Sequence, residues 1–413
     1  MSRNLLSGLR VIESSAFVAA PLCGLTLAQF GAQVIRVDMI GGGIDYSRMP
    51  LAPSGRSFYW TGLNRQKRSL AVDLSRPEGR ELVAELASAP GEDGGVLLTN
   101  IPARWLSHDS LAARRPDMIT CTIEGNSDGT TAVDYTVNCA TGYPAITGPG
   151  SRERPVNHAF PAWDVACALQ AATAIASAVL RRRATGEGAE LRIALSDVAF
   201  ATISSLGLVA EAELTGEDRA STGNDIYGAF GRDFPTGDGQ RVMVAAISRK
   251  QWTSLVSACG IGEAIAALET ALGSDFGRES ERFEHRDIIA ALVRRWTQAR
   301  SLEEIGRVFQ EAGVCWGPYR TVRELLAHDP RVAPEAGLFR TIDTPGIGAH
   351  RAAGSPVRLA GAEPDAIRPA AYLGADTDAV LADILKLSAA QIARLHDAGI
   401  VAGPDRDPTV RPV

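Results

Sequence analysis

The stretch NHAFPAWDVACALQAATAIASAVLRRR, residues 157–183, predicts a long helix that is buried on nearly every side. From Val165 to Leu180 the stretch is almost continuously apolar and rich in alanine, which is typical of a helix inside a protein core. It ends in three arginines, residues 181–183, which suit a C-terminal turn because that end of a helix carries partial negative charge. The fold is therefore expected to be organised around this helix.

Asp164 stands where this helix is expected to begin. An N-cap is the plainer interpretation from this stretch alone, because aspartate is a good N-cap residue. The second interpretation is a carboxylate nucleophile: a helix N-terminus keeps a carboxylate ionised even where apolar walls would raise its pKa. An ionised, poorly solvated carboxylate can attack a thioester. The two interpretations are compatible, and the rest of the sequence favours the second.

The composition predicts an ordinary globular protein of about two domains. The chain has 413 residues, of which 45% are hydrophobic and 22% charged, enough to bury a large core. A net charge of -6 gives no electrostatic footprint for nucleic acid, so an anionic ligand needs a local basic site. Apolar runs without polar interruption stay below about 18 residues, so no membrane span is expected. The start MSRNLLSGLRVIE lacks a signal-peptide core.

Cysteine and histidine patterns indicate neither disulfides nor a metal site. The six cysteines are scattered, mostly in apolar runs, without a CxxC pair. They are therefore expected to be reduced thiols of a cytoplasmic protein. The six histidines form no HxxxH or HExxH pattern, so no metal site is expected.

The N-terminal part alternates between strand and helix patterns. Helical spacing of apolar residues runs through residues 19–32, and alternation of this kind implies parallel strands joined by crossover helices. Short apolar runs predict strands at LRVIES (9–14), QVIRVD (33–38), SLAVD (69–73), GVLLTN (95–100) and MITCTIEG (118–125).

Changes in composition divide the remainder of the chain. Residues 215–239 are enriched in Gly, Asp and Arg, so residues 201–221 are expected to link residues 1–200 to a smaller α+β domain at 222–328. A Pro- and Gly-rich linker is expected at 329–368. Two short helices are expected within 369–413, the second opened by a capping box from Ser388 to Gln391.

A basic cluster precedes the third expected strand. It contains Arg65, Lys67 and Arg68 in the run NRQKRS. A surface charge cluster is the common interpretation, but three cations at a strand start would also suit a phosphate-bearing ligand. The three glycines at 41–43 could likewise hold phosphate, although a flexible loop is the plainer interpretation because no GxGxxG pattern is present.

Taken together, these runs resemble the family III CoA transferases, which include carnitine CoA-transferase and formyl-CoA transferase. The matching pieces span nearly the whole chain in the family's order: GLRVIE with Pro21, LAQFGAQVIRVD, NRQKRSLAVDLSRPEGREL, AWD, TGEGAELRIALSD, GVCWGPYRTVRELLAHDP, GSPVRL and LGADTDAVLADILKLSAAQIARLHDAGIV. The resemblance implies an α/β fold with a Rossmann-like large domain, begun by residues 1–200 and completed by 369–413. It also implies a smaller α+β domain and an interlocked homodimer.

The resemblance places the nucleophile and the CoA site on particular residues. It implies that Asp164 is the nucleophilic aspartate, at the start of the long helix. An adenosine contact at the end of the second strand falls on Met39, with Arg36 three residues earlier. The residues expected to bind CoA are Phe17, Val18 and Ala19 near the thioester, Lys67 and Arg68 near the phosphates, and Arg36 and Arg104.

Local motifs point to one reaction within the family. SAFVAAPL, GGGIDY, VDYTVN, NHAFPAWD and GNDIYGAFGRDF resemble the enzymes that move CoA between the two carboxylates of one mesaconate (2-methylfumarate) molecule. The implied substrate is the CoA thioester of a small dicarboxylic acid, with CoA as part of the substrate and no separate cofactor. The residues expected in the substrate pocket are Tyr135, Trp163, Tyr227 and Arg232, with a structural salt bridge as an equal alternative for Arg232.

Three other functions stay open at this point. A bimolecular acyl-CoA:carboxylate CoA transferase would use the same Asp164 and the same covalent steps. An α-methylacyl-CoA racemase needs a proton-moving histidine paired with an aspartate, and the residue ahead of Asp134 is Val133, which cannot transfer a proton. A non-enzymatic CoA-binding regulatory protein is disfavoured by Asp164 at the nucleophile position.

Overall fold

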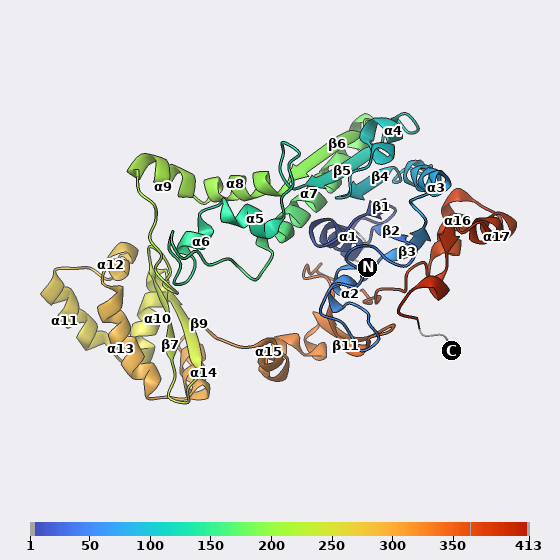
Figure 1. The fold of residues 1–413 in the computed structure, drawn as a ribbon. Coiled ribbons are helices and arrows are strands. Elements are labelled where there is room, and N and C mark those ends of the chain that lie inside the picture. The colour runs from blue at the N-terminus through green and yellow to red at the C-terminus, as the bar shows by residue number, and fades with distance from the viewer. Residues whose placement is uncertain (1–4, 364, 411–413) are drawn as a thin grey trace. The chain divides into compact units, whose positions relative to one another are not determined.

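The computed structural model describes residues 5–363 and 365–410, which form two compact units (Figure 1). Unit 1 comprises Met1–Thr141, His158–Ala210 and Pro330–Val413, as far as these are described. Unit 2 comprises Gly142–Asn157 and Glu211–Asp329. Each unit has its own apolar core.

Unit 1 is an α/β domain built on a seven-stranded sheet of order β12-β3-β2-β1-β4-β5-β6. The strands from β3 to β6 run parallel, and β12 joins one edge antiparallel. The predicted Rossmann-like α/β fold with a mostly parallel sheet is therefore confirmed. The strands are β1 (Arg10–Ser14), β2 (Gln33–Met39), β3 (Arg68–Val72), β4 (Val96–Thr99), β5 (Ile119–Glu124), β6 (Ala189–Ala194) and β12 (Val401–Ala402).

The central strands form where the sequence has short apolar runs, because both faces of a parallel sheet are covered. All four residues of β4 are buried, and Ile12 of β1 pairs with Ile35 on one side and Leu97 on the other.

The helices of this unit are α1 (Ala19–Gln29), α2 (Phe58–Leu63), α3 (Pro77–Ser88), α4 (His108–Ala112), α5 (Asp134–Cys139), α7 (Ala162–Thr185), α8 (Leu195–Ser205), α16 (Thr377–Leu385) and α17 (Ala389–Asp397). The short 3-10 turns are η1 (Arg104–Leu106), η2 (Pro330–Val332), η3 (Pro334–Ala336) and η4 (Pro404–Arg406).

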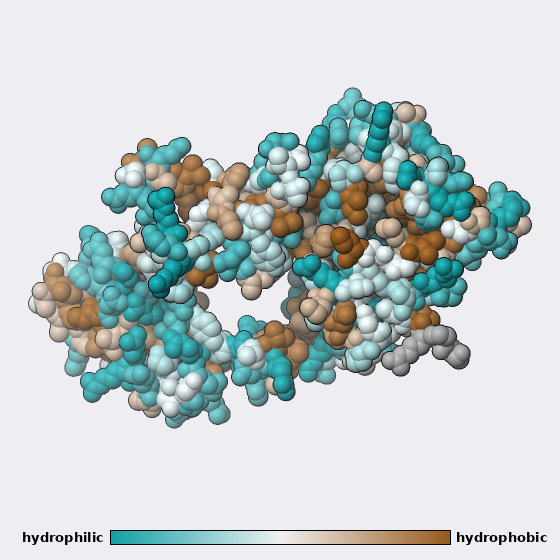
Figure 2. All heavy atoms as spheres, viewed as in Figure 1, coloured by the Kyte–Doolittle hydropathy of each residue, from teal (hydrophilic) through white to brown (hydrophobic). Residues whose placement is uncertain are grey.

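The long helix α7 differs from its prediction at its start and in its burial. It begins at Ala162, so Asp164 is its third residue and the N-cap position belongs to Pro161. One face packs on α1 and β5, but Leu169 is 50% exposed and Leu180 65% exposed. Brown and tan residues also show on the surface along α8 (Figure 2). The prediction of burial on nearly every side was therefore wrong for a single chain.

By length and composition α7 would be long enough to cross a membrane, and so would α8 and α9 (Leu208–Thr215) taken together as one bent pair. Gln170, Thr173 and Ser177 interrupt the apolar run of α7, and the absence of a membrane span stays a prediction. The buried side of α7, which includes Cys167, Ala171 and Ile175, lies against other elements of unit 1. The core helix of a globular protein passes the same test.

Unit 2 is an α+β domain with a three-stranded antiparallel sheet. Its core gathers buried aromatic residues, among them Phe230, Phe234 and Trp252. Residues 142–157, expected in the large domain, belong to this unit. Its elements are α6 (Tyr143–Ile146), most of α9, β7 (Phe230–Pro235), β8 (Arg241–Ala246), α10 (Arg249–Cys259), α11 (Gly262–Leu272), α12 (Glu279–Glu284), α13 (Arg286–Gln298), α14 (Leu302–Glu311), β9 (Cys315–Pro318) and α15 (Val322–His328).

Both segments expected as linkers contain regular structure. Residues 201–221 include the end of α8 and all of α9, and residues 329–368 include a hairpin of β10 (Phe339–Thr344) and β11 (Gly348–Ala353). Figure 1 shows the red helices α16 and α17 near the blue strand β3, in agreement with the contacts of α16 with β3 and α3. The capping box is confirmed, since Ser388 Oγ accepts the N–H of Gln391 and Gln391 Oε1 accepts the N–H of Ser388.

Candidate active site

The N-termini of α1 and α7 lie at the same edge of the sheet of unit 1. Helix α1 follows the carboxyl end of β1, and α7 returns from the carboxyl end of β5 toward the start of β6. The two helices pack against each other. The first turn of α1, with Val18 and Ala19, and the first turn of α7, with Asp164, are therefore carried by packed helices that begin at the edge where open α/β sheets bind ligands.

The turn from β1 to α1 is held in a strained conformation. Phe17 has a φ of 64°, a left-handed backbone that is rare and costly for an aromatic residue. The carboxylate of Asp45 accepts the N–H of Phe17 at 2.8 Å. The side chain of Asn100, after β4, accepts the N–H of Ala16 at 2.9 Å and donates to its carbonyl at 2.8 Å. These bonds fix the backbone at Phe17, Val18 and Ala19, where the thioester is expected.

Asp134, not Asp164, occupies the N-terminus of α7. Its Oδ2 accepts the backbone N–H of Trp163 at 2.7 Å and of Asp164 at 3.0 Å. Its Oδ1 lies 2.7 Å from Nε2 of His158. Asp134 is buried, and its carboxylate satisfies donors that a helix start otherwise leaves without partners. The favourable position that the sequence offered to Asp164 is therefore held by its neighbour.

The side chain of Asp164 is left poorly solvated beside another carboxylate. Burial and then the charge of Asp134 raise the pKa of Asp164 to about 7, and Arg48 opposes them. The carboxylate of Asp164 has no hydrogen-bond partner among the described residues. The N–H groups of Trp163 and Asp164, which were expected to favour the ionised form of Asp164, donate to Asp134 instead. A carboxylate of this kind is a better nucleophile than a solvated one.

Three aromatic residues lie in the region of Asp164. Trp163 is buried, and its Nε1 donates to Oδ1 of Asn138 at 3.0 Å. Tyr135 is 41% exposed and its ring meets that of His158 edge-on at 5.9 Å. The pKa of Tyr59 is raised to about 12, chiefly by burial, with contributions from Asp164 and Tyr135. Tyr59 is therefore close to the predicted nucleophile, and no motif in the sequence marked it.

Arg48 is an exposed cation that acts on the charge of Asp164. Its guanidinium lies 5.6 Å from the ring centroid of Phe17 and 5.2 Å from that of Tyr59. It lowers the pKa of both Asp164 and Tyr59. Stacking on aromatic faces holds an arginine in place without using its N–H donors.

A cavity of about 380 Å³ opens at the carboxyl edge of β1, β2 and β4. Strand order reverses there, because β2 and β4 flank β1 on opposite sides. Such a switch point is where open α/β sheets hold nucleotides. Arg80 lies in the wall, where it donates to the carbonyls of Leu74 and Ser75. Arg104 is exposed directly beside lining residue Ala103.

The structure gives Arg36 and Lys67 roles inside the protein. Lys67 is 3% exposed, and its Nζ donates to Glu13 Oε1, the Pro21 carbonyl and Asn64 Oδ1, each at 2.8 Å. An ammonium has three donors, so Lys67 has none left for a phosphate. Arg36 is also buried and bonds Asp38 at 2.7 Å and Glu13 at 3.2 Å. Direct phosphate binding by Lys67 was therefore a wrong prediction.

Arg68 faces the C-terminal helices instead of the cavity. Its guanidinium pairs with Asp376 at 3.6 Å and with Asp383 of α16 at 3.3 Å. These contacts tie the start of β3 to α16, so the prediction of a phosphate contact does not hold for Arg68 in this arrangement. Burial lowers the pKa of Lys67, its neighbour, to about 8, although Glu13 opposes the effect.

Tyr227 and Arg232 belong to unit 2 and have partners there. Arg232 forms ion pairs with Asp225 and, at 2.8 Å, with Asp287. Tyr227 lies under the guanidinium of Arg219 at 4.0 Å from its ring centroid. These contacts agree with the second interpretation of Arg232, a structural salt bridge. Both residues belong to unit 2, and their place in the substrate pocket stays a prediction.

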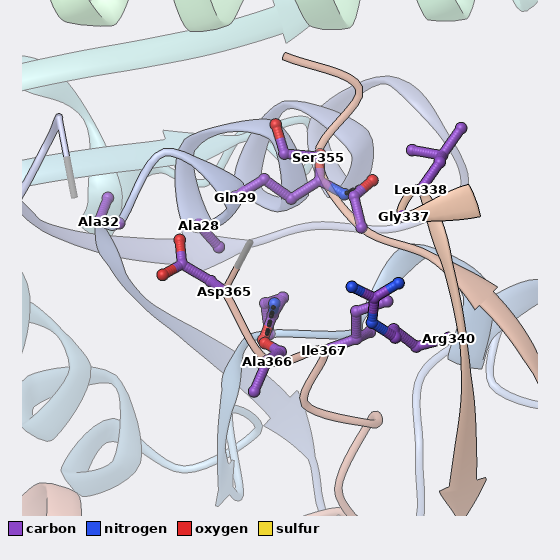
Figure 3. Close-up of a pocket in the computed structure, with 13 residues that line it drawn as sticks. Ala28, Gln29, Ala32, Gly337, Leu338, Arg340, Ser355, Asp365, Ala366 and Ile367 are labelled. Atoms are coloured by element: carbon purple, nitrogen blue, oxygen red, sulfur yellow. Dashed lines mark hydrogen bonds between the residues drawn. The ribbon is translucent and has the colours of Figure 1, made fainter. Parts of the chain in front are cut away.

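A second cavity, shown in Figure 3, lies away from this edge. It has a volume of about 270 Å³ and is lined by the end of α1, the residue before β2 and the segment around β10 and β11. The guanidinium of Arg340 in its wall donates to the carbonyls of Pro334 and Phe339. Since it adjoins the amino end of β2, it is at the opposite edge of the sheet from Asp164.

Outside this site, Glu281, Glu284 and His285 of unit 2 form the one group of possible metal ligands found among the described residues, with their ligand atoms within 4.8 Å of one another. Ser274 Oγ lies 2.9 Å from Nε2 of His285. Exposed acidic groups are common without an ion. Asp164 is not part of this group.

Sequence reasoning missed His158 as the partner of Asp134. A racemase histidine was expected directly ahead of Asp134, where the chain has Val133. In the structure the imidazole comes from 24 residues further along the chain. Both residues stand in motifs singled out above, VDYTVN and NHAFPAWD, but nothing in either motif shows that the loop between them folds back.

Comparison with known proteins identifies the family of this chain. The model of "CoA-transferase family III" matches residues 6–377. The chain is 48% identical over 406 residues to a 2-methylfumaryl-CoA isomerase of Chloroflexus aurantiacus, covering 98% of this chain and 99% of that one. It is 28% identical to a succinyl-CoA–D-citramalate CoA-transferase of the same organism, covering 96% and 98%.

A solved structure supports the fold. A CAIB/BAIF family protein from Brucella suis superimposes with a TM-score of 0.73 at 26% identity, covering 92% of this chain and 98% of that chain. The family model matches most of the sequence, and the Chloroflexus relative matches nearly all of it. This chain therefore belongs to CoA-transferase family III.

Proposed function

We propose that this protein is an intramolecular CoA transferase that converts 2-methylfumaryl-CoA into 3-methylfumaryl-CoA, with Asp164 as its nucleophile. The observation that carries the proposal is the carboxylate of Asp164. It is poorly solvated and has no hydrogen-bond partner among the described residues, and it stands at the sheet edge where the strained turn at Phe17 also lies. The 48% identity to a 2-methylfumaryl-CoA isomerase supports the choice of substrate.

The first half of the reaction moves CoA onto the enzyme. An Asp164 oxygen attacks the C1 thioester carbon, the C–S bond breaks, and CoA leaves as a thiolate, so a mixed anhydride is formed. The thiolate then attacks the Asp164 carbonyl carbon. A new C–S bond forms, the anhydride C–O bond breaks, and its electron pair leaves with the C1 carboxylate of mesaconate.

The second half repeats these steps at the other end of the diacid. The C4 carboxylate attacks the aspartyl-CoA thioester and expels the thiolate, giving an anhydride with C4. The thiolate attacks the C4 carbonyl carbon, and Asp164 leaves as a carboxylate. No proton is consumed, so Asp164 must enter the cycle deprotonated. Its pKa of about 7 leaves a large fraction ionised at neutral pH.

Both covalent intermediates are sensitive to water, so the walls around Asp164 have a function. Trp163, next to the nucleophile in the chain, is buried, and both Asp164 and Tyr135 are close enough to Tyr59 to raise its pKa. Apolar and aromatic walls lower the local water content and protect an anhydride. The rigid Phe17 turn, held by Asp45 and Asn100, would keep the thioester oriented toward the carboxylate.

The CoA moiety is proposed to enter the cavity at the β1–β2–β4 edge. Arg80 and Arg104 replace Lys67 and Arg68 as the phosphate-binding candidates, because neither has an ion-pair partner among the described residues. Arginine side chains are well suited to phosphate oxygens. The 380 Å³ cavity would hold only part of CoA, with the rest along the rim.

A homodimer is proposed as the working form. Leu169 and Leu180 of α7, Phe200 of α8 and Leu206 directly after α8 are exposed, and a groove of about 750 Å³ runs between α7, β6 and α8. Exposed apolar residues on this scale mark an interface. Light scattering should give a mass of twice 43.6 kDa.

Because the described cysteines are all free, we also propose a reducing, cytoplasmic location.

The direct test is to incubate the enzyme with 2-methylfumaryl-CoA and separate the C1 and C4 thioesters by chromatography. Isomerisation should proceed without added acid, and excess labelled free mesaconate should stay out of the thioester pool over many turnovers. Hydroxylamine added during turnover should convert Asp164 to a hydroxamate detectable by mass spectrometry of its peptide. The Asp164→Ala variant should give neither isomerisation nor hydroxamate.

Two other results would redirect the assignment. Rapid entry of labelled mesaconate, or transfer to succinate or formate, would show a bimolecular transferase. The contact between Asp134 and His158 makes the racemase worth a parallel assay. Incorporation of deuterium at the α-carbon of a saturated 2-methylacyl-CoA in heavy water, with no isomerisation of 2-methylfumaryl-CoA, would favour that reaction.

A further inference from the structure

The described part of unit 1 has one exposed arginine that is stacked beside Asp164 but makes no ion pair. Arg48 lies in the segment after β2, between the rings of Phe17 and Tyr59. Neither a carboxylate nor a carbonyl accepts from its guanidinium among the residues described. Its five N–H donors are therefore available to a ligand.

The other cations of this region are unavailable. Arg36 and Lys67 are buried and bonded to Glu13, Asp38 and neighbouring oxygens. Arg56 is also buried and donates to the carbonyls of Pro345 and Ala370. Among the described residues, Arg48 is the cation that acts on the charge of Asp164, so a second anionic group beside Asp164 would meet Arg48 as a counter-charge.

A diacid thioester brings such a group. Only two carbons separate the carboxyls of a fumarate, so the free carboxylate must lie close to the thioester that Asp164 attacks. It would meet the negative charges of Asp164 and Asp134, and like charges at short range repel strongly in a poorly solvated site. Arg48 already acts on the pKa of Asp164, so it is near enough to offset this repulsion.

We propose that Arg48 is a specificity-determining residue that binds the uncoupled carboxylate of the substrate. The planar guanidinium, fixed by Phe17 and Tyr59, suits two-point binding of a carboxylate. When CoA is on Asp164, both ends of mesaconate are carboxylates, and Arg48 holds one while the other attacks. When the diacid rotates in the site, its two carboxylates exchange places on Arg48. This inference rests on the proposed function and adds the group that retains the diacid.

The test uses thiol exchange, which needs only the first acylation step. Labelled CoA thiol is incubated with enzyme and either 2-methylfumaryl-CoA or 2-methylbut-2-enoyl-CoA, which has a methyl group where the diacid has its free carboxylate. For Arg48→Gln, kcat/KM of exchange should fall about 10- to 100-fold with the diacid thioester, the usual effect of a lost charged hydrogen bond. With the uncharged thioester it should change less than about 3-fold.

Controls separate this role from folding and from the reaction assignment. Arg48→Lys should retain part of the preference, because it keeps the charge without the planar fork. Arg394→Gln, on the exposed side of α17, should leave both rates unchanged. Equal losses for both thioesters, or no loss with the diacid, would overturn the proposal. If wild-type enzyme exchanges thiol but does not isomerise the diacid, the proposed function fails while the Arg48 comparison still gives its answer.

Discussion

The carboxylate of Asp134 accepts the backbone N–H of Asp164 at 3.0 Å. The two acidic side chains therefore divide the start of α7 between them. Asp134 accepts the N–H groups at the start of the helix. Its negative charge then disfavours the ionised form of Asp164. This arrangement raises the pKa of Asp164 above its ordinary value and yields predictions for rate and for stability.

The first prediction concerns the pH dependence of the reaction. Because Asp164 must be ionised to attack and its pKa is about 7, kcat/KM should rise with pH and level off above about 7. Asp134→Asn removes the second-largest cause of the raised pKa, so the rise should move to lower pH. Asparagine Oδ1 can still accept the N–H of Asp164. An unmoved pH profile in this variant would contradict the proposed electrostatic coupling.

The second prediction concerns folding stability. The folded pKa of Asp164 lies above its ordinary value of 3.8, so between about pH 4 and 7 the folded protein holds a proton that the unfolded chain releases. Stability from this group is therefore lost as pH rises through that window. Asp164→Asn should abolish turnover but raise the unfolding free energy at pH 8 by roughly 1–3 kcal/mol, allowing for partial exposure. Urea unfolding at pH 8 and pH 5 should show a larger gain at pH 8.

The third prediction compares the buried Lys67 with the half-buried Arg68 of the basic cluster. Lys67→Met leaves Glu13 in the core without one of its charged partners, so the unfolding free energy should fall by roughly 3–5 kcal/mol. Arg68→Gln breaks ion pairs with Asp376 and Asp383 nearer the surface and should cost less than about 1 kcal/mol. A large KM increase in a Lys67 variant of unchanged stability would restore the phosphate role.

The fourth prediction places the CoA phosphates. Arg104→Gln and Arg80→Gln should each raise KM for the CoA thioester about 10-fold and leave kcat nearly unchanged, because a distant phosphate contact acts equally on ground and transition states. Arg114→Gln is the matched control, since Arg114 is a surface arginine that pairs with Glu81. If only the control variant changes KM, phosphate lies elsewhere on the surface.

The fifth prediction tests the strained turn. Asn100→Ala removes both bonds to Ala16 and should let Phe17 leave its left-handed conformation. Since the turn orients the thioester, kcat should fall about 10-fold or more while KM changes little. Asn126→Ala, which removes a bond to Thr130 in an exposed loop, should leave kcat unaltered.

The strands could be predicted because burial on both faces leaves a direct mark in the sequence. β4, for example, is wholly buried and appears as the apolar run VLLT. The direction of a charged side chain leaves no such mark. Lys67 points inward because Glu13 of β1 is buried next to it, and the run NRQKRS contains no trace of that partner. Whether a cation meets solvent or a buried carboxylate is decided by packing between strands far apart in sequence.

The start of α7 was predicted to within two residues, but the surroundings of Asp164 were not predicted. A helix start was expected from the apolar run and found at Ala162. The contacts of Asp134 and His158 depend on the path of the loop after α5, which has no period that sequence reasoning can use. Arg48 and Tyr59 were likewise missed, because an arginine and a tyrosine in irregular segments are ordinary until the fold brings them beside Asp164.

The antiparallel strand β12 has a consequence for how the protein is made. Val401 pairs with Val72 and Ala402 with Ala71, so β3 emerges from the ribosome more than 300 residues before its edge partner. During translation the open edge of β3 presents unpaired N–H and C=O groups, the kind of edge that invites pairing with other chains. All of unit 2 is synthesised in that interval. Nascent chains released before Val401 should therefore aggregate or recruit chaperones even though nearly all of the catalytic residues are already present.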